Sequence, residues 1–177
     1  MAEYPASLIP GMFVNAVDGN ILEVQAFMNE FIGKILKEAD CNAKVVWDIP
    51  SREDGTERSR HFEILRNGFV LCYGAVSSSE TVDDMKVVES HRLHREVLRP
   101  RSRDAGYIFV AKNTGEGLKL EFAIARCVEG DLDILPALVD PNMSTVYLDK
   151  NYPREGPKEA FRAFLAACIQ LLPVPTA

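Results

Sequence analysis

Residues 90–103, SHRLHREVLRPRSR, concentrate the side chains that most readily bind anions or metals. The segment holds five of the chain's twelve arginines and two of its three histidines, although the whole chain carries a formal charge of −6. Guanidinium groups pair with carboxylates and phosphates, and histidine pairs on a helix occur in metal sites. Three interpretations therefore compete: a metal or catalytic site, a nucleic-acid contact, and a purely structural role.

The metal and catalytic interpretations lack companion residues. His91 and His94 stand three apart, but no Cys-x-x-Cys pair or carboxylate at a matching helical offset completes a metal site. Cys72 lies in an apolar run with no charged neighbour to lower the pKa of its thiol, although His61 could pair with it across a hairpin. Residues 113–117, NTGEG, join two strands and open no helix, unlike a phosphate loop. We therefore predict no catalytic residue, no metal and no cofactor, and the balance favours a non-catalytic protein.

The spacing of the arginines predicts a stripe on an amphipathic helix. As a strand, residues 85–99 would mix charged and apolar groups on each face, whereas at 100° per residue Arg92, Arg95 and Arg99 fall on one arc. Thr81 suits the N-cap of this helix. The predicted apolar arc on the other side consists of Val87, Ser90, His91, Leu93, His94, Val97 and Leu98.

The arginine stripe has a structural and a functional interpretation. A solvated helix face would pair its arginines with Glu89, Glu96 and Asp104, as surface charges ordinarily do. A docking surface would instead meet an acidic segment of another protein. A nucleic-acid contact is disfavoured because the chain is acidic and no aromatic residue interleaves the arginines. The predicted partner-binding set is Arg92, Arg95, Arg99, Arg101 and Arg103.

The chain's length and composition indicate one globular domain over residues 1–177. Of its 177 residues 47% are hydrophobic and 26% are charged, which is average for a chain that buries a full core. Residues 1–17 are expected to be irregular, with a possible edge strand at 12–14. The sequence shows no signal peptide and no apolar run of ~18 residues, so we predict a cytoplasmic protein without a membrane span. The four separated cysteines are expected to be reduced.

Periodicity and turn chemistry predict an α+β fold, with a mainly antiparallel sheet of five to seven strands and N-terminal, middle and C-terminal helices packed on it. Asn20 suits the N-cap of the first helix, and Asn67-Gly68 is a strong hairpin signal. The predicted register places Phe62 and Ile64 on one face, and Phe69, Leu71 and Tyr73 on one face of the partner strand. The expected elements are helices over 20–39, between the Thr81 cap and Pro100, and over 157–172, strands over 44–50, 61–65, 69–76, 107–111, 118–125 and 144–148, and a helical turn over 132–139.

The terminal helix predicted over 157–172 is unusually apolar. Its polar face is narrow, so the helix is either packed deeply within the chain or shared with a second subunit. The second possibility predicts a homodimer.

The order of elements resembles that of the small acidic chaperones of bacterial type III secretion and of YbjN-like domains. The segments that carry the resemblance are FIGKILKEADC, KVVWDIP, HFEILRNGFVLCYGAV, GYIFVAKNTGEGLKLEFAIA and EAFRAFLAACIQLL, which together span most of residues 20–172. The resemblance implies a homodimer that wraps an unfolded partner segment along apolar grooves, without catalysis.

Three functions follow from these patterns. The first is a cytosolic, non-catalytic protein-binding module, similar to a secretion chaperone, that holds an acidic or partly unfolded partner segment. The second is a helix-on-curved-sheet domain that binds or converts a small apolar molecule, which requires a cavity beside Phe62, Leu71, Phe109 and Phe122. The third is an inhibitor or immunity protein whose acidic surface meets a basic toxin.

Overall fold

The structure is a computed structural model that describes residues 16–39, 42–48, 58–138, 144–149 and 156–170. Its elements are α2 (Ile21–Glu38), β1 (Ala43–Trp47), β2 (Ser59–Arg66), β3 (Phe69–Ser77), α3 (Val82–Leu93), the π-helix η2 (His94–Leu98), β4 (Ala105–Asn113), β5 (Gly117–Val128), β6 (Asp131–Pro136), β7 (Thr145–Asp149) and α5 (Gly156–Gln170). The predicted edge strand at 12–14, residues 49–50 of the predicted strand, and residues 171–172 of the predicted helix lie outside the described residues.

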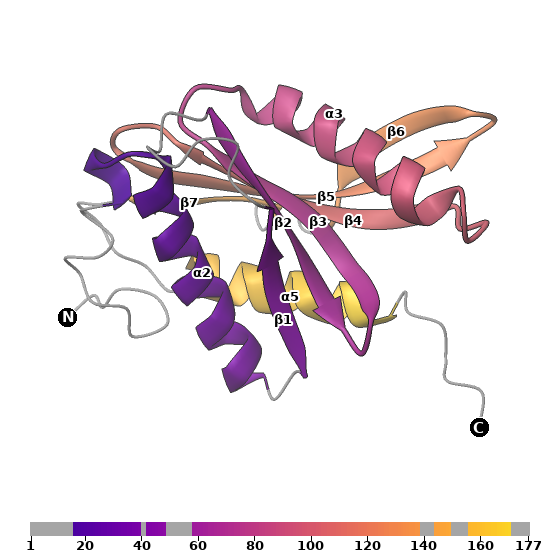
Figure 1. Ribbon diagram of the computed structural model, residues 1–177, viewed down its shortest axis with the longest axis horizontal. Coiled ribbons are helices and arrows are strands. Elements are labelled where there is room, and N and C mark those ends of the chain that lie inside the picture. Colours follow the sequence, from indigo (N-terminus) through magenta and orange to yellow (C-terminus); the bar gives the residue numbers. More distant parts are fainter. Residues whose placement is uncertain (1–15, 40–41, 49–57, 139–143, 150–155, 171–177) are drawn as a thin grey trace.

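The strands form one mostly antiparallel sheet in the order β1-β2-β3-β4-β5-β6, and β7 pairs with the first half of β5. The pair β3–β4 is parallel, because the chain crosses over the sheet through α3 and η2 between them. Figure 1 shows α3 on one face of the sheet and α2 and α5 on the other. The predicted α+β fold, with helices at the start, middle and end of the chain, is confirmed.

The larger core lies between the sheet and the pair α2 and α5. Phe109 stacks on Phe122 with ring centroids 4.8 Å apart, and Phe161 and Phe164 of α5 pack against both rings. The four positions that the ligand-binding interpretation needed around a cavity are buried side chains of this core: Phe62, Leu71, Phe109 and Phe122. Three aromatic rings and the Leu71 side chain therefore fill the inner face of the sheet at these positions.

Local signals placed the first helix and the first hairpin correctly. The Asn20 side chain accepts hydrogen bonds from the backbone N–H groups of Leu22 and Glu23, which caps α2. Asn67 and Gly68 both have positive φ angles, 51° and 80°, as a tight two-residue hairpin turn requires. Both features depend on residues adjacent in sequence, so the sequence alone can specify them.

The faces predicted for the first hairpin are confirmed on one strand and wrong on the other: Phe62 and Ile64 share the core face, whereas Phe69, Leu71 and Tyr73 do not share a face. The ladder between β2 and β3 shifts between Ile64 and Leu65, and a bulge of this kind reverses the faces that follow it. Leu71 and Cys72 therefore both join the larger core, whereas Tyr73 packs on the α3 face. Phe69 is exposed rather than aligned with them.

The helical turn predicted over 132–139 is also wrong. Residues Asp131–Pro136 form β6, which pairs with the second half of β5. Exposed Asp131 and Asp133 alternate with half-buried Leu132 and Ile134, a period of two that fits a strand better than a helical turn. The strand predicted over 144–148 is confirmed as β7.

The two ends of the described chain are packed against the core. Of the segment 1–17, which was expected to be irregular, Ala16 and Val17 are described, and both are helical and buried. Their carbonyl groups accept hydrogen bonds from the side chain of Asn113. The terminal helix α5 buries Phe161, Phe164, Leu165 and Cys168 within the chain.

Candidate functional site

The face of α3 and η2 that packs on the sheet differs from the predicted apolar arc. The buried row is Val82, Met85, Glu89, Leu93 and Val97, with Ser90 and Leu98 beside it. His91 and Val87 are exposed instead, and His94 is half-buried. The row advances by three or four residues per step and runs on into the π-helix, whose turn is wider than that of an α-helix. The hydropathy pattern does not indicate this face, because Glu89 occupies its centre.

Glu89 anchors a cluster of charged side chains between α3 and β2. Its side chain is fully buried, and one carboxylate oxygen lies 2.5 Å from Nδ1 of His61. The other accepts a hydrogen bond from Nη1 of Arg92 at 3.2 Å. Nη2 of Arg92 lies 3.3 Å from Asp48, and the guanidinium carbon lies 4.6 Å from the ring centroid of Tyr73. A buried carboxylate with two such partners is compensated rather than isolated.

These contacts set the protonation of two neighbouring groups. The hydrogen bond to Glu89 raises the pKa of His61 above its ordinary value and outweighs the lowering caused by partial burial. Burial, followed by its hydrogen bond to Glu96, raises the pKa of Tyr73. The Tyr73 hydroxyl donates that bond at 2.8 Å. His61 is thus held toward its charged form by a partner on another element.

An open pocket of about 480 Å³ lies above this cluster, between α3 and the neighbouring ends of β1 and β2. Its lining residues are Asp48, His61, Val87, Val88, His91, Arg92, Arg95 and Glu96. Val87 and Val88 are large apolar side chains with nearly half of their surface exposed. The pocket therefore joins an apolar strip of α3 to charged groups of both signs.

The structure separates Arg92 from the other four predicted partner-binding residues. Arg92 is largely buried and neutralised by Glu89 and Asp48. Arg95 is 72% exposed at its side chain and reaches only the adjacent Glu96, at 3.5 Å. The predicted pairings of this stripe with Glu89 and Glu96 are thus present: Arg92 pairs with Glu89, and Arg95 pairs with Glu96.

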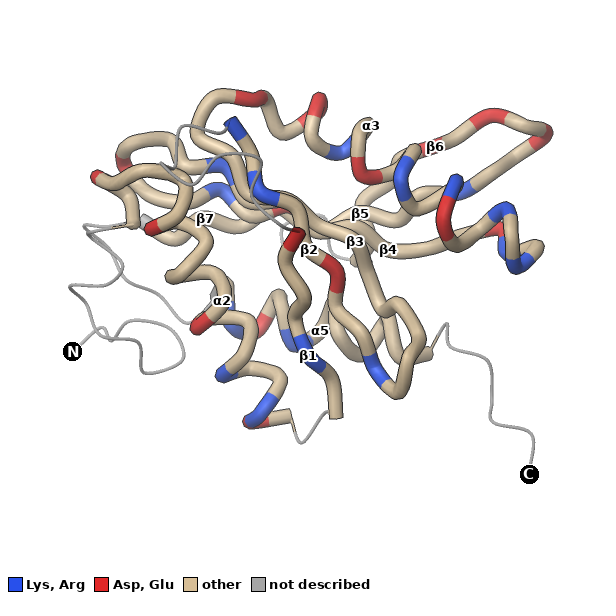
Figure 2. The backbone as a smooth tube through the Cα atoms, in the orientation of Figure 1, with Lys and Arg blue, Asp and Glu red and all other residues tan. Residues whose placement is uncertain are grey.

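The last three arginines lie where η2 ends and the chain turns toward β4. Arg99 and Arg101 are exposed, and the guanidinium carbon of Arg101 lies 5.5 Å from the ring centroid of Phe69. Burial, and then the charge of Arg101, lowers the pKa of the half-buried Arg103. Across the described ranges, no carboxylate forms an ion pair with any of the three. Figure 2 shows basic positions gathered at this end of the helical segment.

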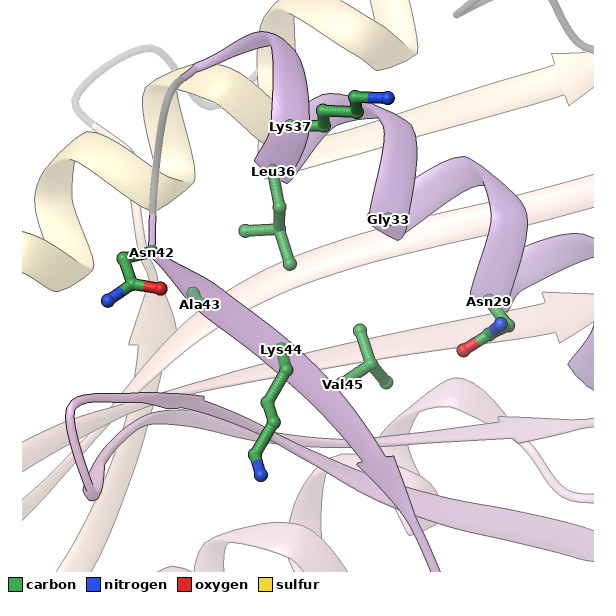
Figure 3. A pocket seen from close by; sticks show the side chains of 8 residues that line it. All are labelled: Asn29, Gly33, Leu36, Lys37, Asn42, Ala43, Lys44 and Val45. Atoms are coloured by element: carbon green, nitrogen blue, oxygen red, sulfur yellow. The ribbon is translucent and has the colours of Figure 1, made fainter.

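A second open pocket of about 620 Å³ lies between the C-terminal half of α2 and β1 (Figure 3). Its lining residues are Asn29, Gly33, Leu36, Lys37, Asn42, Ala43, Lys44 and Val45. In Figure 3 the side chains of Leu36 and Val45 point toward one another across this space, whereas Lys44 points away from it. Sequence patterns gave no sign of this pocket, because its two walls come from elements that meet only in the fold.

The cysteine–histidine pair considered from the sequence does not form. Cys72 belongs to the core beneath α2 and α5, whereas His61 contacts Glu89 on the opposite face of the sheet. Within the part of the chain that the structure describes, no three metal-ligating side chains gather at one point. No described helix is both long enough and apolar enough to cross a membrane.

Comparisons with protein-family models, with curated proteins and with solved structures found no match. The geometry of the two pockets and of the exposed arginines is therefore the basis for a functional proposal.

Proposed function

We propose that the protein is a non-catalytic protein-binding module that holds an acidic segment of a partner against the C-terminal end of η2. The surface consists of Arg95, Arg99 and Arg101, and Arg103 supports it from a half-buried position. Arg92, which the sequence grouped with them, serves the fold instead, because two carboxylates already neutralise it. This assignment narrows the predicted set to the arginines that no buried carboxylate neutralises.

Among the residues that the structure describes, no carboxylate forms an ion pair with Arg99 or Arg101. This observation carries the proposal. The chain has 26 acidic residues against 20 lysines and arginines, so nearby carboxylates would be the ordinary neighbours of an exposed arginine. Elsewhere the same chain does pair its charges, as Arg162 and Lys158 of α5 do with Glu38 of α2. A cluster of cations without such partners attracts an acidic segment, mainly by steering its approach and fixing its register.

The apolar strip of α3 extends this surface. Val87 and Val88 lie two to three helical turns before Arg95 and Arg99 on the outer side of the helical segment, and each keeps nearly half of its surface exposed. A partner segment with apolar residues followed by carboxylates would contact both parts. The order of helices and strands, which resembles that of secretion chaperones, is consistent with holding an extended segment of this kind.

The predicted homodimer remains a prediction. The apolar face of the terminal helix suggested it. However, α5 buries Phe161, Phe164 and Cys168 of that face within its own chain. Light scattering at micromolar concentration would measure the mass directly, and the monomer mass would remove the homodimer from this proposal.

A labelled acidic peptide tests the proposed surface. We expect a peptide in which a run of leucines precedes a run of glutamates to bind the wild-type chain with an affinity that falls steeply with salt. The triple variant Arg95→Ala, Arg99→Ala, Arg101→Ala should bind it at least about tenfold more weakly with an unchanged melting temperature. The control triple Lys34→Ala, Lys37→Ala, Arg126→Ala removes the same charge elsewhere and should retain binding. Equal losses in both triples would mean that net charge alone attracts the peptide, which contradicts a defined surface.

A further inference from the structure

The first strand of the sheet has a free edge among the described residues. β1 pairs only with β2, and the sheet order ends there. The backbone N–H of Asp48 donates to the carbonyl of His61, its opposite residue in the same register. Since N–H and C=O directions alternate along an antiparallel strand, the corresponding groups of Lys44 and Val46 also face β2. Those of Val45 and Trp47 therefore face the open edge.

The second pocket lies along this open edge. Val45 and Leu36 provide its apolar walls, and Lys37 of α2 and Lys44 of β1 stand beside it. The lysines form no ion pair within the described part of the chain. An extended segment added to the edge would bond to the backbone of Val45 and Trp47 and turn alternate side chains into the pocket, since strand side chains alternate between faces.

Gly33 supplies an independent observation. It lies in the interior of α2, where glycine weakens a helix by about 1 kcal/mol relative to alanine. A Cβ atom built on Gly33 would meet nothing within 4 Å, so no packing in this chain requires the missing side chain. The residue lines the pocket beside β1. Its absent side chain leaves space for an incoming group close to the helix backbone.

We propose that the edge of β1 and the pocket beside α2 form a β-strand addition site for an extended segment of another protein that alternates apolar and acidic residues. Apolar side chains would enter the space between Gly33, Leu36 and Val45. Acidic side chains on the opposite face of the added strand would meet Lys44, which points away from the pocket. Main-chain bonds give such complexes affinity, and the pocket gives them specificity.

The charge of the edge argues for this occupant over a second copy of the chain. A lysine on an edge strand disfavours pairing between identical edges, because like charges approach one another across the new ladder. The same lysine favours a strand with a carboxylate at the facing position. The site does not depend on the arginine surface proposed above, because it lies on the first strand of the sheet and uses none of those arginines.

A designed peptide and two pairs of variants of the full chain test the site. The probe is a fluorescent peptide of sequence Val-Glu-Val-Thr-Val-Glu-Val, and a peptide of equal composition without the alternation is its control. Gly33→Leu fills the pocket, whereas Gly33→Ala adds only a methyl group where space is open. Val45→Pro removes the N–H that faces the edge, whereas Val45→Thr keeps it. Leucine and alanine both favour the helix over glycine, so neither change at Gly33 should unfold the chain.

We expect the alternating peptide to bind the wild-type chain, and Gly33→Leu and Val45→Pro to weaken it by about tenfold or more. Gly33→Ala, Val45→Thr and the triple arginine variant should bind normally. Hydrogen exchange should slow on binding at the amides of Val45 and Trp47 but not at Lys44 and Val46, which already bond to β2. This alternation is a signature that nonspecific association would not produce.

Three results would overturn the proposal. The first is no binding of the alternating peptide at concentrations up to about 1 mM, where the affinity of a functional site would be negligible. The second is binding that Gly33→Leu and Val45→Pro leave unchanged. The third is slow exchange at Val45 and Trp47 in the protein alone, which would mean that another part of the chain or a second copy already covers the edge. Hydrogen exchange measured at lower protein concentration would distinguish these two cases, because dilution removes a second copy but not another part of the same chain.

Discussion

Replacing Glu89 with glutamine tests whether the buried charge cluster holds α3 on the sheet. Glu89→Gln keeps the shape of the side chain but removes the charge that His61 and Arg92 share. Hydrogen bonds to charged groups contribute about 1.5–3 kcal/mol each, so two such bonds set an upper limit of about 6 kcal/mol. His61 and Arg92 keep 32% and 14% of their side-chain surface exposed and can regain water in the variant. We therefore expect a loss of about 3 kcal/mol near pH 6.

The loss should depend on pH in a defined direction. The pKa of His61 is raised in the folded state by its hydrogen bond to Glu89, from an ordinary value of 6.5. The stability that this provides is complete below pH 6.5 and disappears as the pH rises through the folded pKa. Glu89→Gln removes the cause of the raised pKa. The difference in unfolding free energy between wild type and variant should therefore be larger at pH 6 than at pH 9.

Urea unfolding followed by the fluorescence of Trp47, the single tryptophan, measures both quantities. Its indole ring packs on Phe62, with centroids 4.8 Å apart, so unfolding changes its surroundings. Asp83→Asn is the matched control: it removes a carboxylate from the same helix, but one that is 90% exposed, and it should change stability by less than about 0.5 kcal/mol. A Glu89→Gln loss no larger than this control, or an equal loss at pH 6 and pH 9, would refute the reasoning.

Two further substitutions test the packing of the sheet and the division among the arginines. In Gly74→Ala the new Cβ would lie 2.2 Å from the ring of Phe62 and 2.5 Å from the carbonyl oxygen of Phe109. Thermal unfolding should therefore show that the unfolding free energy falls by about 2 kcal/mol or more. An unchanged melting temperature would contradict the close approach. Arg92→Ala should cost about 2 kcal/mol in urea unfolding because it leaves buried Glu89 without one partner, whereas Arg95→Ala should cost less than about 0.5 kcal/mol. Similar losses for both arginines would mean that burial does not separate their roles.

Sequence patterns were sufficient wherever adjacent residues decide the structure. The Asn20 cap and the Asn67-Gly68 turn each bond or bend within a few residues, so their chemistry is visible in the sequence. The strand predicted over 118–125 likewise lies within β5. Together these local features fixed the order of most elements, and the fold class followed from that order.

The candidate sites depend on partners that are distant in sequence. Glu89 meets His61 across 28 residues, and no hydropathy pattern places a glutamate at the centre of a buried helix face. Its position in the row of Met85, Leu93 and Val97, at spacings of four, was the available signal. The bulge after Ile64 was also hidden, because a ladder irregularity depends on how two strands pair rather than on either strand alone.

The sheet divides the apolar interior into two unequal parts, and this division has a consequence for local unfolding. The layer beneath α2 and α5 is a large continuous cluster, whereas α3 and η2 are held by two small ones. Regions with fewer buried apolar contacts open at lower free energy than the molecule as a whole. We expect α3 and η2 to detach from the sheet before the strands of the sheet separate. The bonds between His61, Glu89 and Arg92 oppose this local unfolding.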